Sequence, residues 1–262
     1  MNDEAATLRA FHGDATIREK YIKRVRKHRL RDELVKGFGW ERGKGCAIGC
    51  TLEAYDHNRY PIELGLPTWI AHLEDAIFEN LPYAEAQLWP ERFLEAITPG
   101  ANVDLIKHKL IMRRIDRLIK FQTMLLSFNS NYSANVSNAI TLTIAALRQA
   151  RVYHSYKVMS PYGICSRSFP DSCEAAKAVA LKAATEAAAG EFYTEGLMAE
   201  ASVDAVYALR PCSDTINMVG TASAAVNSIC LASEALSVEL TREEAWMIEA
   251  FDLLELLREL RP

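Results

Sequence analysis

The amino-acid sequence predicts a mostly α-helical protein, built as a helical bundle or as stacked antiparallel helices with an irregular Gly/Cys-rich loop region. Apolar residues recur at helical spacing along most of the 262-residue chain. Residue patterns that cap helices precede several of these stretches. The chain after residue 170 is rich in alanine, which has the highest helix propensity. Together these three observations favour packed helices over a sheet.

The first helix is expected over residues 14–36, where apolar side chains recur every three or four positions. Thr16 and Glu19 have the spacing of a capping box at its start. Gly37 stands just past the last periodic residue, where glycine commonly ends a helix. The glycine-rich loop therefore follows directly from this helix.

Three further helices are expected before the middle of the chain, over residues 68–78, 83–97 and 102–126. Thr68 is the expected N-cap of the first of them, because a threonine hydroxyl accepts hydrogen bonds from free backbone amides. Pro90 is expected to break or restart the second, because proline fits a first turn but not a helix interior.

The connecting region 127–170 leaves two alternatives open. Residues 135–156 have helical periodicity, but their β-branched residues also suit a strand. Residues 161–163, Pro-Tyr-Gly, indicate a turn, and Pro170 is expected to close a loop.

The last part of the chain is expected to form four helices. Asp171 and Glu174 have capping-box spacing and open an alanine-dense helix that ends at Gly190. The other three are expected over 196–209, 221–237 and 242–260. Thr241 with Glu244 opens the last of them, whose apolar stripe is the strongest in the chain.

Charge is distributed unevenly along the chain, although the net charge is only −4. Residues 1–170 carry 24 Lys and Arg against 18 Asp and Glu, whereas residues 171–262 carry 6 against 16. Either the two parts attract each other, or the first part meets an anionic partner, or the two parts are solvated surfaces that differ in charge. We divide the chain into a helical part with the Gly/Cys loop (1–126), a connecting region (127–170) and an alanine-rich acidic part (171–262).

The sequence favours a soluble, cytoplasmic protein with no membrane partner. A bilayer-spanning helix needs about 20 apolar residues, and no such run occurs. Residues 1–6 lack the basic and apolar regions of a secretory signal. The six cysteines are then expected to be thiols or metal ligands rather than disulfides. Three of them lie among small apolar residues and are expected to be buried: Cys173, Cys212 and Cys230.

The stretch 37–50 is the most distinctive part of the sequence, since it holds five of the twelve glycines and two of the six cysteines. Glycine at this density predicts a backbone that turns through positive φ or packs very closely. In the simplest interpretation it is a tight structural turn, with Cys46 and Cys50 as core fillers and Trp40 covering the turn.

A cysteine-dependent reaction is one functional alternative for this loop. Cys46, surrounded by backbone amides, would be the nucleophile and His57 its base. Arg42 and Lys44 would supply positive potential nearby.

A metal or anion site is the other alternative. Four side chains of types that bind zinc follow one another, although their spacing fits zinc knuckles poorly: Cys46, Cys50, His57 and His72. We therefore predict no cofactor, with zinc as the alternative. Dinucleotide and Walker motifs are excluded, because the last interval of the glycine series 43–49 is one residue too long and the Walker lysine is missing. The alternative that stays open is an anion site formed by backbone amides and Lys44.

Two predicted helices are strongly basic. Residues 18–36 hold nine Lys and Arg, and residues 107–120 hold six. Such side chains bind nucleic-acid phosphates, with Lys23, Arg26 and Lys27 as the candidates on the first helix. The alternative is a solvated face or a docking surface for the acidic helices, since no known reading module is evident.

Several segments resemble a family of bacterial and phage proteins. The similar segments are Gly43-Lys-Gly-Cys-Ala-Ile-Gly-Cys-Thr-Leu-Glu53, His57-Asn-Arg-Tyr-Pro-Ile-Glu-Leu-Gly-Leu-Pro67, Leu73-Glu-Asp-Ala-Ile-Phe-Glu-Asn-Leu-Pro82 and the Trp-Pro-Glu-Arg-Phe-Leu-Glu-Ala-Ile stretch at 89–97. The resemblance covers residues 37–104, and the chain departs from the pattern over 107–170. It implies that the loop and the two helices after it form one unit. It carries no activity over to any residue.

We therefore expect a non-enzymatic binding or regulatory protein in a phage- or mobile-element-related setting. Its partner would be another protein or a second copy of itself. The expected binding residues are Trp40, Arg42, Lys44, Cys50, Lys23, Arg26 and Lys27. A cysteine-dependent hydrolase or transferase that uses Cys46 and His57 is the first alternative, and a nucleic-acid-binding protein is the second.

Overall fold

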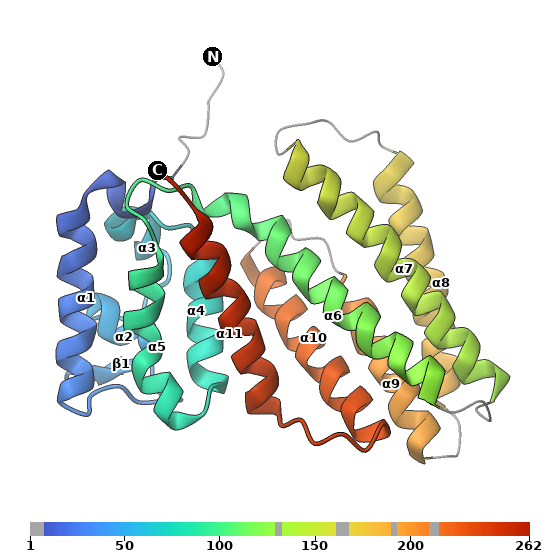
Figure 1. The fold of residues 1–262 in the computed structure, drawn as a ribbon. Coiled ribbons are helices and arrows are strands. Elements are labelled where there is room, and N and C mark those ends of the chain that lie inside the picture. Colours follow the sequence, from blue (N-terminus) through green and yellow to red (C-terminus); the bar gives the residue numbers. More distant parts are fainter. Residues whose placement is uncertain (1–7, 129–132, 161–167, 190–192, 210–214) are drawn as a thin grey trace. The chain divides into compact units, whose positions relative to one another are not determined.

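The computed structural model describes residues 8–128, 133–160, 168–189, 193–209 and 215–262. These residues form eleven α-helices, two 3-10 helices and one two-stranded sheet, which confirms the mostly α-helical prediction (Figure 1). Contacts group the chain into two compact units. The N-terminal unit comprises residues 1–107, 214–219 and 246–262, and the C-terminal unit comprises residues 108–213 and 220–245. The N-terminal unit therefore includes residues from both the start and the end of the chain. The division by composition instead consists of three consecutive segments.

The N-terminal unit is a cluster of short helices. In order, its elements are the 3-10 helix η1 (Ala10–Gly13), α1 (Ala15–Leu30), β1 (Trp40–Glu41), β2 (Lys44–Gly45), α2 (Ala47–Leu52), α3 (Arg59–Leu64), α4 (Thr68–Asn80), α5 (Tyr83–Ala96), the 3-10 helix η2 (Val103–Ile106) and most of α11 (Arg242–Glu259). Helix α1 packs on α2 and α5, while α4 packs on α2, α3 and α5 (Figure 1). Buried side chains from these helices form the core, among them Tyr21, Val25, Ile48, Ile70, Phe78 and Phe93.

Helix α1 differs from its prediction at both ends. Its N-cap is Asp14 rather than Thr16, because the Asp14 carboxylate accepts the Thr16 amide at 2.7 Å. The helix ends at Leu30, not at residue 36. Asp32 turns the chain with a φ of 52°, and Leu34 is then buried beside strand β2. Burial of this apolar side chain against the hairpin outweighs continued helix formation.

Helices α4 and α5 are present at the predicted positions. Thr68 is the first residue of α4 and Pro67 is its N-cap, so the prediction of Thr68 as N-cap is wrong. Helix α5 runs without a break through Pro90. Packing explains this, since Pro90 and its neighbours Trp89 and Phe93 are buried, and this burial offsets the hydrogen bond that proline removes.

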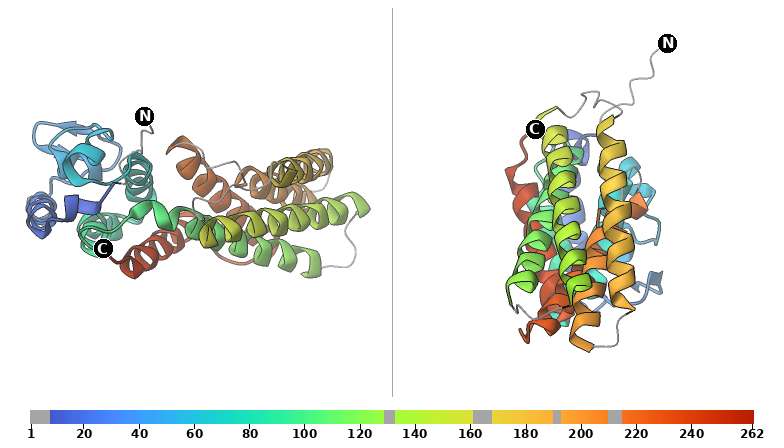
Figure 2. Two further views of the ribbon diagram at one scale, coloured as in Figure 1. Left: turned by 90° about the horizontal axis from the view of Figure 1, so that it is seen from above. Right: turned by 90° about the vertical axis from the view of Figure 1, so that its right-hand side faces the viewer.

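The C-terminal unit contains longer helices. They are α6 (Lys107–Phe128), α7 (Ala134–Met159), α8 (Ser168–Ala188), α9 (Tyr193–Tyr207), most of α10 (Thr215–Ala235) and the start of α11. Helices α7 and α8 run side by side in opposite directions, and both pack on α9 (Figure 2). The core between these helices consists mainly of small and aliphatic residues, including Val136, Ile140, Ala184, Met198, Ala201 and Ala232.

Helix α7 resolves the helix-or-strand alternative. The buried residues Ala139, Thr143, Ala146 and Ala150 are spaced three or four apart, as on one face of a helix. Ser133 caps the helix by accepting the Val136 amide at 3.3 Å. A strand would instead bury alternate residues.

Helix α8 begins at Ser168, earlier than predicted. Pro170 and Asp171 therefore lie in its first turn, and their predicted roles in a loop and a cap are wrong. Proline is tolerated there because first-turn amides lack helical partners anyway. The predicted turn at 161–163 and the end at Gly190 lie outside the described residues.

The cap predicted for α11 is confirmed. The Thr241 amide donates to Glu244 Oε2 at 2.8 Å, and the Glu244 amide donates to Thr241 Oγ1 at 3.1 Å. Throughout the described residues, no helix is both long enough and apolar enough to cross a bilayer.

Candidate functional site

The Gly/Cys loop folds into a small hairpin on the N-terminal unit. Strands β1 and β2 pair antiparallel, with Trp40 opposite Gly45. The connecting residues Arg42 and Gly43 have φ values of 51° and 83°. Two positive φ values in a two-residue loop are typical of a type I′ turn, whose twist matches that of the strands. The hairpin thus needs glycine at position 43 for conformational reasons.

Three other glycines are needed because neighbouring atoms pack closely against them. A Cβ atom on Gly45 or Gly49 would lie 2.2 or 2.0 Å from the Gly39 carbonyl oxygen. A side chain at Gly39 would meet the Tyr55 ring at 2.7 Å. The close packing expected of a structural turn is therefore present. It allows α2 to pack directly against the hairpin.

Both thiols of the loop are buried. Cys46 is 1% exposed and is the N-cap of α2. Burial and the neighbouring Asp75 carboxylate raise the pKa of its thiol. Cys50 is fully buried, and its thiol donates to the carbonyl oxygens of Glu33 and Gly45 at 3.5 and 3.4 Å. Burial raises the pKa of Cys50 to about 12. Both thiols are therefore protonated at neutral pH.

Asp75 of α4 is the centre of a polar cluster beneath the hairpin. Its Oδ2 atom lies 3.2 Å from the Tyr55 hydroxyl, which donates to it, and 3.2 Å from His57 Nε2. Asp75 is only 8% exposed, yet its Oδ1 atom has no hydrogen-bond partner among the described residues. Such an orphaned buried oxygen is rare in folded proteins.

Glu79 and Cys46 complete this cluster. One ligand-type atom from each of Cys46, Asp75 and Glu79 lies within 4.8 Å of the other two. The Gly37 amide donates to Glu79 Oε2 at 2.6 Å. Burial raises the pKa of Glu79. We use the name acidic thiol cluster for Cys46, Asp75 and Glu79.

The histidines predicted as metal ligands lie beside this cluster. His57 and His72 stack, with ring centroids 3.9 Å apart and planes inclined by 3°. Burial lowers the pKa of His72. Cys46 and His57 adjoin the same carboxylate, that of Asp75, whereas the Cys50 thiol is bound to backbone carbonyls.

Sequence reasoning missed Asp75 and Glu79. A signal for them is present, because His72, Asp75 and Glu79 are spaced three and four apart and so share one face of α4. That spacing alone does not say which loop the face meets. The apposition with Cys46 follows from the packing of α2 on α4.

A second buried pair lies in the same unit. The Tyr60 hydroxyl donates to Glu74 Oε2 at 2.5 Å, and both residues are fully buried. Burial raises the pKa of Glu74 well above its usual range. Because both groups are enclosed and bind each other, this pair is a structural contact between α3 and α4.

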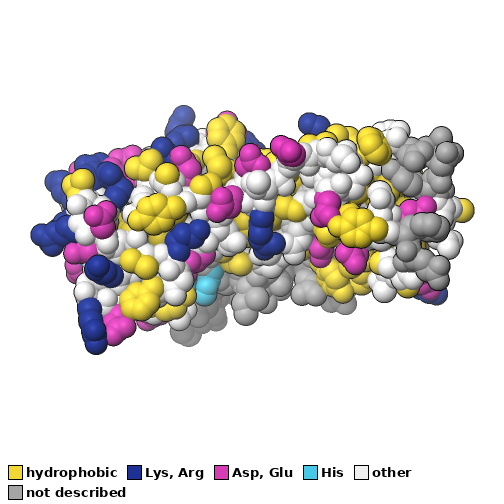
Figure 3. All heavy atoms as spheres, turned by 90° about the horizontal axis from the view of Figure 1, so that it is seen from below, with side chains coloured by type: hydrophobic (Ala, Val, Ile, Leu, Met, Phe, Trp, Pro, Cys, Tyr) yellow, Lys and Arg dark blue, Asp and Glu magenta, His cyan; other side chains and the backbone are white. Residues whose placement is uncertain are grey.

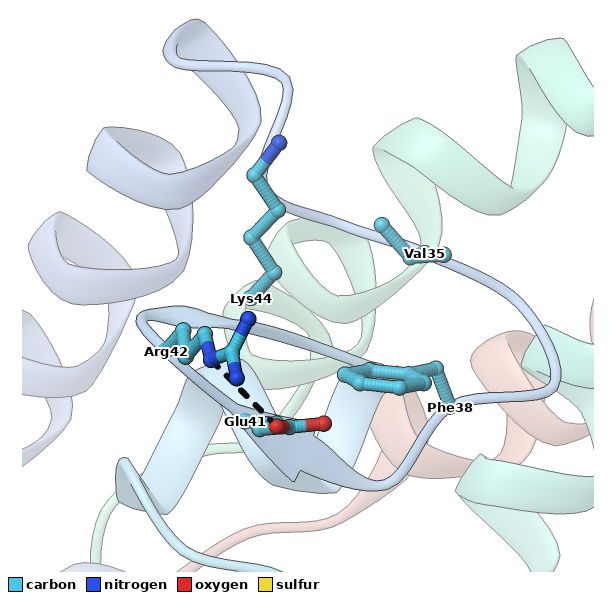
Figure 4. Close-up of a pocket in the computed structure, with 5 residues that line it drawn as sticks. All are labelled: Val35, Phe38, Glu41, Arg42 and Lys44. Carbon is cyan, nitrogen blue, oxygen red and sulfur yellow. Dashed lines mark ion pairs between the residues drawn. The ribbon is translucent and has the colours of Figure 1, made fainter.

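A pocket of about 340 Å³ opens on the outer side of the hairpin (Figure 4). Val35 and Phe38 form its apolar walls and are 36% and 39% exposed. Arg42 pairs with the adjacent Glu41 at 3.4 Å, but its side chain is 90% exposed. Lys44 also lines the pocket and forms no ion pair with the described residues. The pocket therefore combines apolar walls with two cationic groups and one carboxylate, that of Glu41, which Arg42 neutralises.

No known protein family, curated protein or solved structure matches the chain. The resemblance of residues 37–104 to a family of bacterial and phage proteins therefore stays a prediction.

The remaining predicted binding residues lie away from the pocket. Trp40 is half-buried and contacts His28 edge to face, with ring centroids 5.4 Å apart. On α1, Lys23 lies 3.9 Å from Glu19, while Lys27 is exposed.

Arg26 does not extend freely into solvent. It binds Glu91 of α5 at 2.7 Å and Glu95 at 3.2 Å. Lys and Arg side chains gather over the part of the N-terminal unit that contains α1, with Asp and Glu among them (Figure 3). Part of this basic surface is thus neutralised by ion pairs within the unit.

Proposed function

We propose that the protein is a non-enzymatic binding protein whose hairpin pocket recognises an acidic, apolar segment of a partner protein. The observation that carries this proposal is the composition of the pocket. Phe38 and Val35 remain exposed at its walls, and Lys44 lines it without an ion-pair partner among the described residues. A partner segment that has an apolar side chain beside a carboxylate would suit this pocket. Its apolar side chain would pack against Val35 and Phe38, and its carboxylate would pair with Lys44.

The expected affinity is modest. Burying one leucine-sized side chain against Phe38 contributes about 1.5–3 kcal/mol. An exposed carboxylate near Lys44 or Arg42 adds roughly 0.2–1 kcal/mol for each pair. These contributions sum to roughly 2–5 kcal/mol before the loss of translational freedom is subtracted, so one pocket by itself supports a Kd of about a millimolar or weaker. Contacts outside the pocket would add to this.

The burial of both thiols favours binding over catalysis. A nucleophilic cysteine needs a thiolate that substrate can reach. Cys46 is 1% exposed, and its thiol pKa is raised rather than lowered. The nucleic-acid alternative receives less support for a different reason, since Arg26 is already engaged by Glu91. The phage-related setting stays a prediction from the resemblance.

A peptide titration tests this proposal. The probe is a fluorescein-labelled peptide of alternating Glu and Leu, and the matched probe replaces each Glu with Gln. Fluorescence anisotropy should show binding of the acidic probe that weakens as salt rises. Lys44→Glu should weaken it by about 2- to 30-fold, since it removes one attraction and adds a repulsion of similar size, together roughly 0.4–2 kcal/mol.

Lys182→Glu is the matched control, because Lys182 is equally charged but lies on α8 with a 77% exposed side chain. It should leave the affinity unchanged. Equal binding of both probes, or no effect of Lys44→Glu, would contradict the proposal. Self-association that Lys44→Glu abolishes would identify a second copy of the chain as the occupant instead.

A further inference from the structure

The acidic thiol cluster lies beneath the hairpin and is separate from the pocket. Both carboxylates of the cluster are oriented by partners outside it. Asp75 is held through Oδ2 by Tyr55 and His57, and Glu79 is held through Oε2 by the Gly37 amide. Metal-binding side chains are commonly fixed by such outer hydrogen bonds.

The inner side of the cluster is left unsatisfied. Asp75 Oδ1 is buried and has no hydrogen-bond partner among the described residues. No Lys or Arg of the described residues forms an ion pair with Asp75 or Glu79. A largely buried Asp75 carboxylate and a half-buried Glu79 carboxylate beside each other are unfavourable without a balancing cation. A bound cation would remove the imbalance.

We propose that Cys46, Asp75 and Glu79 bind a divalent transition-metal ion, with zinc as the best match. A thiolate with two carboxylates suits zinc, because Mg²⁺ and Ca²⁺ take oxygen ligands and avoid sulfur. Ligand atoms of a tetrahedral zinc ion lie about 3.3–3.8 Å apart, given bonds of roughly 2.0–2.3 Å. The observed separations are at most 4.8 Å, so metal binding would draw the ligand atoms together by up to about 1–1.5 Å.

This ligand set differs from the one that the spacing of cysteines and histidines indicates. Cys50 is excluded, because its thiol faces the carbonyls of Glu33 and Gly45. His57 is an orienting partner of Asp75 rather than a ligand. Three protein ligands are one fewer than structural zinc sites use, so the ion keeps one position for water or a small ligand.

Cobalt binding tests the proposal directly, because Co²⁺ replaces Zn²⁺ and absorbs in the near-ultraviolet when a thiolate binds it. Full-length protein is dialysed against a chelator and then titrated with Co²⁺. We expect one Co²⁺ per chain with thiolate-to-cobalt absorption, and its displacement by one equivalent of Zn²⁺.

Cys46→Ser should abolish the thiolate absorption and weaken binding at least 100-fold. Cys50→Ser is the matched control, since it removes a thiol four residues away and should retain both signals. Glu79→Gln, which keeps the side-chain shape, should weaken binding without removing the absorption. Circular dichroism verifies that each variant is folded.

Wild-type protein that binds no stoichiometric Co²⁺ or Zn²⁺ would overturn the proposal. So would a folded Cys46→Ser or Glu79→Gln variant that binds as tightly as wild type. The peptide titration of the hairpin pocket is independent of either result.

Discussion

Replacing Gly49 with alanine should destabilise the N-terminal unit, although alanine is the better helix former. A Cβ atom at this position would lie 2.0 Å from the Gly39 carbonyl oxygen and 3.3 Å from Trp40 Cβ. Carbon and oxygen atoms normally approach to about 3.5 Å, so one side must move by about 1.5 Å. The obstructing atom belongs to the backbone, and it also accepts the Cys46 amide at 3.1 Å.

The magnitude follows from two opposing terms. Alanine gains about 1 kcal/mol over glycine in a helix interior. Overpacking a closely packed site costs about 1–3 kcal/mol, and occasionally more. The cost at Gly49 belongs at the upper end, because a backbone carbonyl cannot rotate away as a flexible side chain can. We expect a net loss of about 2 kcal/mol in the free energy of unfolding.

Tryptophan fluorescence during urea denaturation measures this loss. It reports on the N-terminal unit, because all four tryptophans belong to that unit: Trp40, Trp69, Trp89 and Trp246. The urea midpoint of Gly49→Ala should fall relative to wild type.

Two further glycines serve as controls. Gly220 of α10 has no atom within 4 Å of an added Cβ, so Gly220→Ala should stabilise its helix by about 0.5–1 kcal/mol. Circular dichroism in urea measures this gain, because Gly220 belongs to the C-terminal unit, which contains no tryptophan. Gly43 also has open space but a φ of 83°, so Gly43→Ala isolates conformational strain of about 1–2 kcal/mol. A Gly49→Ala variant with an unchanged or raised urea midpoint would refute the packing argument.

Two further predictions concern buried polar groups. Burial and the nearby His108 and Lys177 lower the pKa of His154 from 6.5 to about 3, so the unfolded chain binds a proton there first as pH falls. Stability should then fall below pH 6.5 by about 1.4 kcal/mol per pH unit, and His154→Gln should remove this slope in denaturation curves measured at pH 7 and 5.5. Tyr60→Phe should cost about 1–3 kcal/mol in urea denaturation, because it leaves the buried Glu74 without its hydrogen-bond donor.

The predictions for His154 and Tyr60 can each be contradicted by a specific result. For His154, equal pH slopes in wild type and variant would show that this histidine is not buried in its neutral form. For Tyr60, the matched change is Tyr83→Phe, since Tyr83 is 65% exposed and should tolerate the loss of its hydroxyl. Equal effects of the two tyrosine variants would contradict a special role for the buried pair.

The helices could largely be predicted from the sequence, because their apolar periodicity is local. The capping box of Thr241 and Glu244 shows this well, since both partners lie within one turn. The predicted helix ends and breaks were wrong where contacts with residues distant in the sequence decide how far a helix extends. Helix α1 stops at Leu30 because Leu34 is buried near the hairpin, and α5 continues through Pro90 because its neighbours are buried.

The candidate site divides in the same way. The sequence by itself indicated a glycine-rich turn with two cysteines, because glycine density and residue type are visible in the letters. Only the tertiary structure separated the two thiols, placing Cys50 against backbone carbonyls and Cys46 beside Asp75 and Glu79. Asp75 and Glu79 follow Cys46 by 29 and 33 positions. Contacts over such separations depend on how helices pack, which local patterns do not encode.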